Sequence, residues 1–251
     1  MVCSILQCFS TEAKRFEILS MVDDCGRTTL FYLPPISVLS ALRGLDVDKR
    51  RTLIRMTDKS AKNVLHSVDY TWSTEAVLEL LDIVGTYDIC FKLLAAQDDT
   101  GRTPLFCFKA ETTIAVLKLF NTEQKLMLIQ LRDRCRKTRL HIASDGLKPD
   151  LPGIFDLFVS NEICFTLLTA QDYCGKTPLF YWCAASIIEI LSRLTIEHCL
   201  EVIDKRDNLG KIFLHALCCH NWSEADIVGV LNILASDEQR YSELSSQQNE
   251  G

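Results

Sequence analysis

A short segment near the C-terminus gathers residue types that bind zinc. His215, Cys218, Cys219 and His220 fall within six residues of one another. A structural zinc site needs ligands that converge tetrahedrally, whereas adjacent cysteines on one helix point about 100° apart. The sequence therefore favours buried cysteines beside a surface His220 over a metal site.

Three other cysteines share one position of a recurring turn. Cys25, Cys135 and Cys174 each stand third in the turn, where stacked turns could hold a metal or a ladder of disulfides. Only Cys135 and Cys174 belong to neighbouring copies, so we favour thiols there. The twelve cysteines include no CxxC pair, and in a reducing compartment cysteines are mostly small buried hydrophobes. We expect no metal and no cofactor.

A basic cluster surrounds the fourth copy of this turn. Its members are Arg132, Arg134, Arg136, Lys137 and Arg139. A solvated loop is one interpretation. The other is a docking point for an acidic or phosphorylated partner, because clustered charge steers a partner of opposite sign. The sequence contains no HExxH, GxSxG or glycine-rich phosphate loop, so we expect that the chain is not an enzyme.

Composition excludes several classes of protein. The 251 residues are 48% hydrophobic and carry a net charge of -6, which opposes a general grip on nucleic acid. Only 10 glycines and 6 prolines are present, and this scarcity favours helix. The longest uncharged apolar stretch, Leu179–Ile188, is about half of a membrane span. Since no signal peptide is recognisable, we expect a cytoplasmic protein without membrane insertion.

The elements that position these residues follow from an internal repeat. One phrase occurs six times, each time with Asp first and Leu eighth: DDCGRTTLF, DKSAKNVLH, DDTGRTPLF, DRCRKTRLH, DYCGKTPLF and DNLGKIFLH. The leading aspartates are spaced by 35, 40, 35, 39 and 35 residues, at positions 23, 58, 98, 133, 172 and 207. The ninth residue alternates between Phe and His in step with the spacing. The true unit is therefore a doublet of 74 to 75 residues (35 + 39 and 35 + 40), present three times.

Each copy predicts a turn followed by helices. D-x-x-G is a turn signature in which Asp bonds the backbone ahead of it and Gly supplies a positive φ. The Thr that follows is typical of an N-cap, and Pro104 and Pro178 stand at the first helical position. We expect a short helix of about two turns, then a longer amphipathic helix with Ser73 or Ser223 at its N-cap, then a short third helix.

The turn phrases DDTGRTPLF and DYCGKTPLF resemble the ankyrin repeat, whose signature is D-x-x-G-x-T-P-L-H-x-A. The resemblance implies an all-α, ankyrin-like solenoid of six turn-helix-helix units over residues 1–251. Residues 1–22 would be a partial N-terminal unit or cap, and residues 236–251 a polar C-terminal cap or tail. Ankyrin repeats run to about 33 residues. We expect the surplus after the second helix, as an additional helical turn between units.

The alternating ninth residue has a structural interpretation under this resemblance. The family's His bonds backbone carbonyls and ties neighbouring repeats together, and His66, His141 and His215 match that position. Phe residues 31, 106 and 180 would instead fill the space between repeats by apolar packing.

The resemblance implies a non-enzymatic, monomeric scaffold or adaptor that binds a protein partner, not nucleic acid, through its turns and first helices. The candidate contact residues are Lys59, Asp99, Arg134, Arg136, Lys137, Tyr173, Leu209, Tyr32, Ile142 and Tyr181. The alternative is the repeat region of a larger effector, channel or enzyme whose active part lies outside this chain, which a start in mid-repeat favours. A third interpretation is a metal- or redox-responsive array that uses the cysteines.

Overall fold

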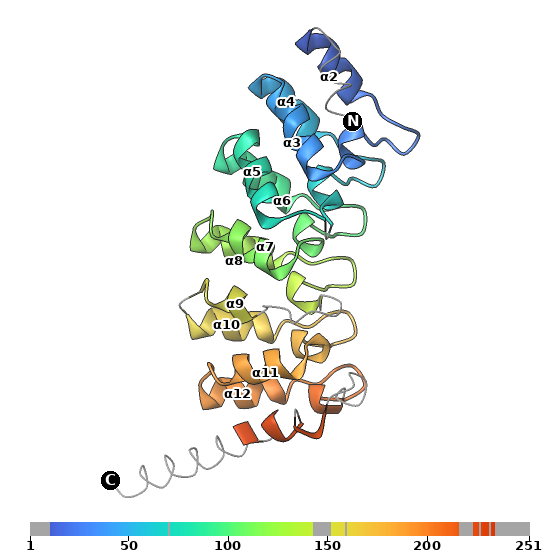
Figure 1. Ribbon diagram of the computed structural model, residues 1–251. Coiled ribbons are helices and arrows are strands. Elements are labelled where there is room, and N and C mark those ends of the chain that lie inside the picture. Colours follow the sequence, from blue (N-terminus) through green and yellow to red (C-terminus); the bar gives the residue numbers. More distant parts are fainter. Residues whose placement is uncertain are drawn as a thin grey trace, which may run out of the picture. The chain divides into compact units, whose positions relative to one another are not determined.

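A computed structural model describes residues 11–69, 71–142, 152–158, 160–215, 223–225, 227–230 and 232–233. These residues form helices and turns without a named β-strand, and the single isolated bridge joins Val22 to Thr28 (Figure 1). The predicted all-α class is confirmed for this part of the chain. The chain divides into two compact units, Met1–Arg134 (unit 1) and Cys135–Gly251 (unit 2).

Both units alternate single turns of 3₁₀-helix (η) with pairs of α-helices. Unit 1 contains α2 (Glu12–Ser20), η1 (Thr29–Phe31), α3 (Pro35–Arg43), α4 (Val47–Arg55), η2 (Val64–Ser67), α5 (Thr74–Val84), α6 (Tyr87–Ala95), η3 (Pro104–Phe106), α7 (Ala110–Leu117) and α8 (Thr122–Gln130). Unit 2 contains η4 (Arg139–His141), α9 (Pro152–Phe155), α10 (Asn161–Leu168), η5 (Pro178–Tyr181), α11 (Ala184–Leu191) and α12 (Ile196–Ile203).

The helix that follows each turn is shorter than predicted. Thr103 and Thr177 stand at N-caps, and Pro104 and Pro178 at the first helical position, as expected. The expected two-turn helix is wrong, however, because each η element has only three or four residues. In the Phe copies the N-cap of the next α-helix follows within about three residues in extended backbone, as at Pro34 with ψ 156°. Proline excludes helical backbone from the residue before it, so η1 cannot continue.

Most of the additional length of the His copies precedes the second helix. Residues 68–73 separate η2 from α5 and residues 142–151 separate η4 from α9, whereas residues 32–34 and 107–109 suffice in the Phe copies η1 and η3. The helices α4, α6 and α8 have nine residues each. The predicted surplus after the second helix, with an additional helical turn, is therefore wrong.

The core of each unit lies between helices of neighbouring copies. In unit 1, α3 packs on α5 and α5 packs on α7. The apolar residues of α5 recur at helical spacing, and Val77, Leu80 and Val84 are fully buried. In unit 2, α9 packs on α11 and α10 on α12. The eighth residue of the phrase faces this core as predicted in five copies: Leu30, Leu65, Leu105, Leu140 and Leu179 are at most 1% exposed.

The predicted N-cap Ser73 is confirmed, since its side chain accepts a hydrogen bond from the amide of Ala76. The second predicted cap, at Ser223, depends on Asp226, which lies outside the described residues. So do the predicted polar cap at 236–251, residues 1–10 of the partial unit, and the Cys218–His220 segment. Among the helices that are described, none combines the length and the apolar character that a membrane crossing requires.

Candidate protein-interaction surface

The leading aspartate of the phrase organises the turn. Oδ1 of Asp58 accepts hydrogen bonds from the amides of Ser60 and Lys62, both at 2.9 Å. The same two contacts, at 2.8 to 2.9 Å, are made by Asp23, Asp98, Asp172 and Asp207. The prediction that these aspartates are turn formers is confirmed.

The fourth residue of the turn adopts left-handed backbone in all six copies. The four glycines there have φ between 75° and 80°, and Ala61 and Arg136 have φ 60°. A Cβ in this conformation costs about 1 to 2 kcal/mol. Arg136 therefore occupies a position that favours glycine, and it does so under strain.

Neighbouring turns are joined by backbone hydrogen bonds from the second residue of one turn to the third residue of the turn before it. In unit 1 the donor and acceptor pairs are Lys59 to Cys25 at 2.9 Å, Asp99 to Ser60 at 2.9 Å and Arg134 to Thr100 at 2.8 Å. In unit 2 they are Tyr173 to Cys135 at 2.8 Å and Asn208 to Cys174 at 2.9 Å. The side chains of the second and third positions are thus held in a row on a fixed backbone.

This row differs in character between the two units. In unit 1 the predicted contact residues Lys59, Asp99 and Arg134 are exposed and charged. In unit 2 the predicted contact residues Tyr173 and Leu209 are 74% and 77% exposed. Asn208 links their two turns further, because its Nδ2 donates to the carbonyl of Tyr173 at 3.0 Å. Unit 2 therefore displays an aromatic and an aliphatic side chain on neighbouring turns.

The two tyrosines predicted on the first helices are partly committed to the fold. Tyr32 is 60% exposed, and its hydroxyl donates to Oδ2 of Asp23 at 2.6 Å. This bond lowers the pKa of the Asp23 carboxyl and raises that of Tyr32. Tyr181 makes the same 2.6 Å bond to Asp172 but is half-buried, and burial together with this bond raises its pKa. Tyr32 therefore offers more surface to a partner than Tyr181 does.

The basic cluster at the fourth turn does not form one solvated patch. Arg139 is 2% exposed and its Nη1 donates to the carbonyl of Ile142 at 3.0 Å, so it is a structural residue. Lys137 is half-buried with its Nζ 4.4 Å above the centre of the Tyr181 ring, which is cation-π geometry. Ile142 is half-buried as well. Arg134 and Arg136 remain exposed.

A set of cations at the fifth turn position was not predicted from the sequence. Every phrase has Arg or Lys there. In unit 1 each of these cations reaches the leading aspartate of the next turn: Arg27 Nε to Asp58 Oδ2 at 3.3 Å, Lys62 Nζ to Asp98 Oδ2 at 4.0 Å and Arg102 Nε to Asp133 Oδ2 at 3.6 Å. The signal was visible, because an acid and a base at fixed positions of every copy are suited to pair between neighbours.

The predicted role of the alternating His, a bond to the neighbouring copy, is confirmed at His66 and His141. Nε2 of His66 contacts the carbonyl of Arg102 in the next copy at 3.0 Å, and Nε2 of His141 contacts the carbonyls of Ala170 and Lys176 at 3.1 and 3.2 Å. For His215 the bond to a neighbouring copy stays a prediction. Phe180 is buried as expected, whereas Phe residues 31 and 106 are half-buried.

The same alternation determines whether the hydroxyl of the N-cap threonine has a hydrogen-bond partner. In a His copy, Oγ1 of Thr138 lies 2.9 Å from Nδ1 of His141. In the Phe copies the ring offers no such partner, and the Oγ1 atoms of Thr28, Thr103 and Thr177 are buried without a hydrogen-bond partner. The desolvation of each of these hydroxyls is not compensated by a hydrogen bond, which lowers the stability of the folded chain.

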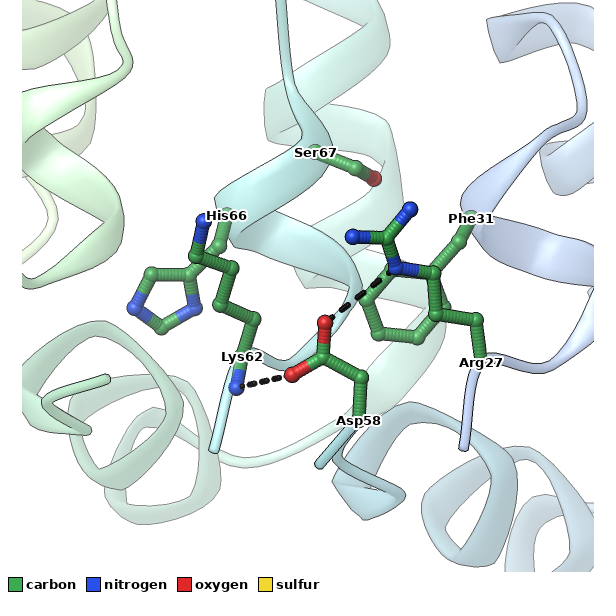
Figure 2. Close-up of a pocket in the computed structure, with 6 residues that line it drawn as sticks. All are labelled: Arg27, Phe31, Asp58, Lys62, His66 and Ser67. Atoms are coloured by element: carbon green, nitrogen blue, oxygen red, sulfur yellow. Dashed lines mark hydrogen bonds and ion pairs between the residues drawn. The ribbon is translucent and has the colours of Figure 1, made fainter. Parts of the chain in front are cut away.

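A hollow of about 180 Å³ lies between the first two turns of unit 1 (Figure 2). It is lined by Arg27, Phe31, Asp58, Lys62, His66 and Ser67. The Arg27 and Lys62 side chains are 40% and 41% exposed, so the hollow is open to solvent. Both Asp58 oxygens are occupied by the turn amides and by Arg27, and the carboxylate is unsuited to act as a base.

The cysteines are more exposed than predicted. Cys90, Cys164 and Cys199 are buried, but the expected burial is wrong for Cys25, Cys107, Cys135 and Cys174, which are exposed. The three cysteines at the third turn position use their carbonyls, not their thiols, to bond the next turn. Within the described ranges, no three His, Cys, Asp or Glu side chains are arranged to hold a metal ion.

Comparison with models of protein families finds no family that matches the chain, and comparison with curated proteins finds no significant relative.

Proposed function

We propose that the chain is a divergent ankyrin-like helical repeat solenoid. Three features of the described residues support this proposal: the left-handed fourth position in all six turns, the backbone bonds between neighbouring turns within each unit, and the contacts of His66 and His141 to the next copy. Each copy buries its apolar helices against a neighbour rather than within itself, which is how repeat proteins are stabilised.

In this proposal the chain is a non-enzymatic scaffold or adaptor that binds a protein partner through its turns. The observation that carries the proposal is the exposed pair Tyr173 and Leu209 on turns joined by the backbone hydrogen bond from Asn208 to Cys174 and by the Asn208 side chain. A backbone that is already held by hydrogen bonds need not be ordered on binding, which lowers the entropic cost, and tyrosine is enriched at interface hot spots. All eight cysteines in the described part of the chain are free thiols. A reducing compartment such as the cytoplasm keeps cysteines in this state, so a cytoplasmic location is part of the proposal.

Affinity capture from a cell lysate tests this function with the wild type beside three variants. The first combines Tyr173→Ser with Leu209→Ser, and the second changes Arg134, Arg136 and Lys137 to Glu. The matched control is Leu200→Ser, because Leu200 is also exposed, at 39%, but lies on α12 away from the turns.

A partner that the wild type and the control retain, and that the Tyr173 and Leu209 variant loses, supports the proposal. Loss in the charge-reversed variant places the partner at the fourth turn instead. Identical partner sets for all four proteins contradict binding through the turns.

A further inference from the structure

The hollow in unit 1 presents more positive than negative charge to an incoming group. Two cations, Arg27 and Lys62, line it against one carboxylate, Asp58. The Asp58 side chain is only 3% exposed, whereas the two cations are about 40% exposed. A ligand that enters therefore meets the guanidinium and the ammonium before it meets the carboxylate.

Asp58 engages Arg27 at one atom only. The contact joins Nε to Oδ2 at 3.3 Å. A bidentate arginine–carboxylate pair would also use an Nη atom. Figure 2 shows the other two guanidinium nitrogens on the side away from Asp58, facing Ser67. The neighbouring Tyr32 hydroxyl and the Asp58 carboxylate raise the pKa of the Arg27 guanidinium, which is charged at pH 7.

Lys62 is paired even more loosely. Its Nζ lies 4.0 Å from Asp98 Oδ2. The strongest N–H⁺···O⁻ bonds are much shorter, at about 2.7 to 2.9 Å. Figure 2 shows the side chain of Lys62 running beside the ring of His66. An oxyanion in the hollow can therefore approach this ammonium more closely than Asp98 does, and no strong existing bond has to break.

The remaining walls add no competing charge. Phe31 contributes an apolar ring, and the Ser67 hydroxyl donates to the carbonyl of Val64 at 2.6 Å. His66 stays neutral at pH 7, because burial lowers its pKa. Recognition in this hollow therefore depends on Arg27 and Lys62.

We propose that this hollow binds an oxyanion carried by the partner's chain, a carboxylate or a phosphate, through Arg27 and Lys62. The inference rests on the proposed scaffold function and names the chemistry of one docking point. Arginine with lysine suits either anion, since guanidinium presents N–H donors in a fork and ammonium adds a point charge. The sequence predicts such a partner at the fourth turn, but the structure offers the better site here.

Titration with inorganic phosphate, and separately with acetate, tests the site at constant ionic strength and pH 7. Nitrogen-15 NMR of the arginine Nε–H groups and of the backbone amides follows binding on the full chain. We expect saturable shifts at Arg27 and Lys62. Arg27→Gln should weaken the binding of the tighter anion at least about tenfold, as loss of one charge-assisted hydrogen bond implies.

The matched control is Arg102→Gln. Arg102 occupies the same turn position and pairs with a buried aspartate at 3.6 Å, yet it does not line the hollow. It should leave anion affinity unchanged. Lys62→Gln is the second variant, because its longer ion pair makes loss of the fold a smaller risk. Equal shifts at Arg102 and Arg27, shifts that do not saturate, or unchanged affinity in both hollow variants overturn the site.

The two anions distinguish the sources. Tighter phosphate indicates a phosphorylated segment, and tighter acetate indicates an acidic side chain. Failure of the site and failure of the scaffold function are separable. A captured partner that ignores Arg27→Gln removes this docking point and keeps the scaffold, whereas saturable anion binding without any captured partner contradicts both the scaffold and a partner-borne ligand.

Discussion

Replacing Ala61 with glycine should stabilise the protein, although alanine to glycine is normally a destabilising change. Ala61 has φ 60° at the turn position where four other copies have glycine. Left-handed backbone costs a residue with a Cβ about 1 to 2 kcal/mol. Glycine has greater freedom in the unfolded chain, which stabilises the unfolded state and reduces the expected gain by about 0.4 to 1 kcal/mol. The net expectation is a gain of about 0.5 to 1 kcal/mol in the free energy of unfolding.

Two matched variants serve as controls for Ala61→Gly. Gly101→Ala reverses the change at the equivalent position, where φ is 80° and an added Cβ would lie 2.9 Å from the amide nitrogen of Arg134. It should destabilise by more than about 1 kcal/mol, because strain and a clash with the next turn combine. Ala115→Gly, inside α7, should destabilise by about 1 kcal/mol through helix propensity alone.

Urea denaturation with a common m-value measures all three differences. The expected order of stability is Ala61→Gly, wild type, then the other two variants. If Ala61→Gly lowers the midpoint as much as Ala115→Gly does, position 61 is not left-handed in solution. The equivalence of the six turns, on which the repeat interpretation depends, would then be wrong.

Three further predictions concern buried polar groups. Thr177→Val should leave stability unchanged or raise it by up to about 1 kcal/mol, because the lost hydroxyl has no partner, whereas Thr138→Val should lower it by about 1 kcal/mol in the same urea assay; equal losses would contradict the difference between Phe and His copies. Because burial lowers the pKa of His66, the unfolded chain binds more protons below about pH 6.5, so stability should fall as the pH drops from 7 through that value and His66→Gln should flatten the slope. Trp182→Phe should cost about 1 to 3 kcal/mol of thermal or urea stability, since it deprives the buried carbonyl of Leu140 of its 2.7 Å bond; a loss below 0.5 kcal/mol, on the order of an ordinary surface change, would contradict this.

The turns could be predicted because their chemistry is local. Asp bonds amides two and four residues ahead of it, and a positive φ follows at the fourth residue, so the phrase alone specifies both features. The inward Leu followed from the regular repeat, whereas the bond of His66 to the next copy was implied by the resemblance to the ankyrin repeat.

What the sequence analysis missed depends on contacts between copies. Arg139 reads as one more surface charge in a basic run, but it is buried with its guanidinium on the Ile142 carbonyl. The hollow at Arg27 and Lys62 exists only when two turns 35 residues apart are stacked. η1 is shorter than the phrase suggests because Pro34 and Pro35, which follow it, disfavour helical backbone in the residues before them.

Site-specific photocrosslinking is a direct test of partner binding through the turns. A photoreactive amino acid is placed at position 173, at position 209 or, as the control, at position 200 on α12, and the chain is irradiated in a lysate. We expect one protein to crosslink at both 173 and 209 and not at 200, because Tyr173 and Leu209 lie on neighbouring turns. Crosslinks of equal yield at all three positions, or at 200 alone, would contradict partner binding through the turns.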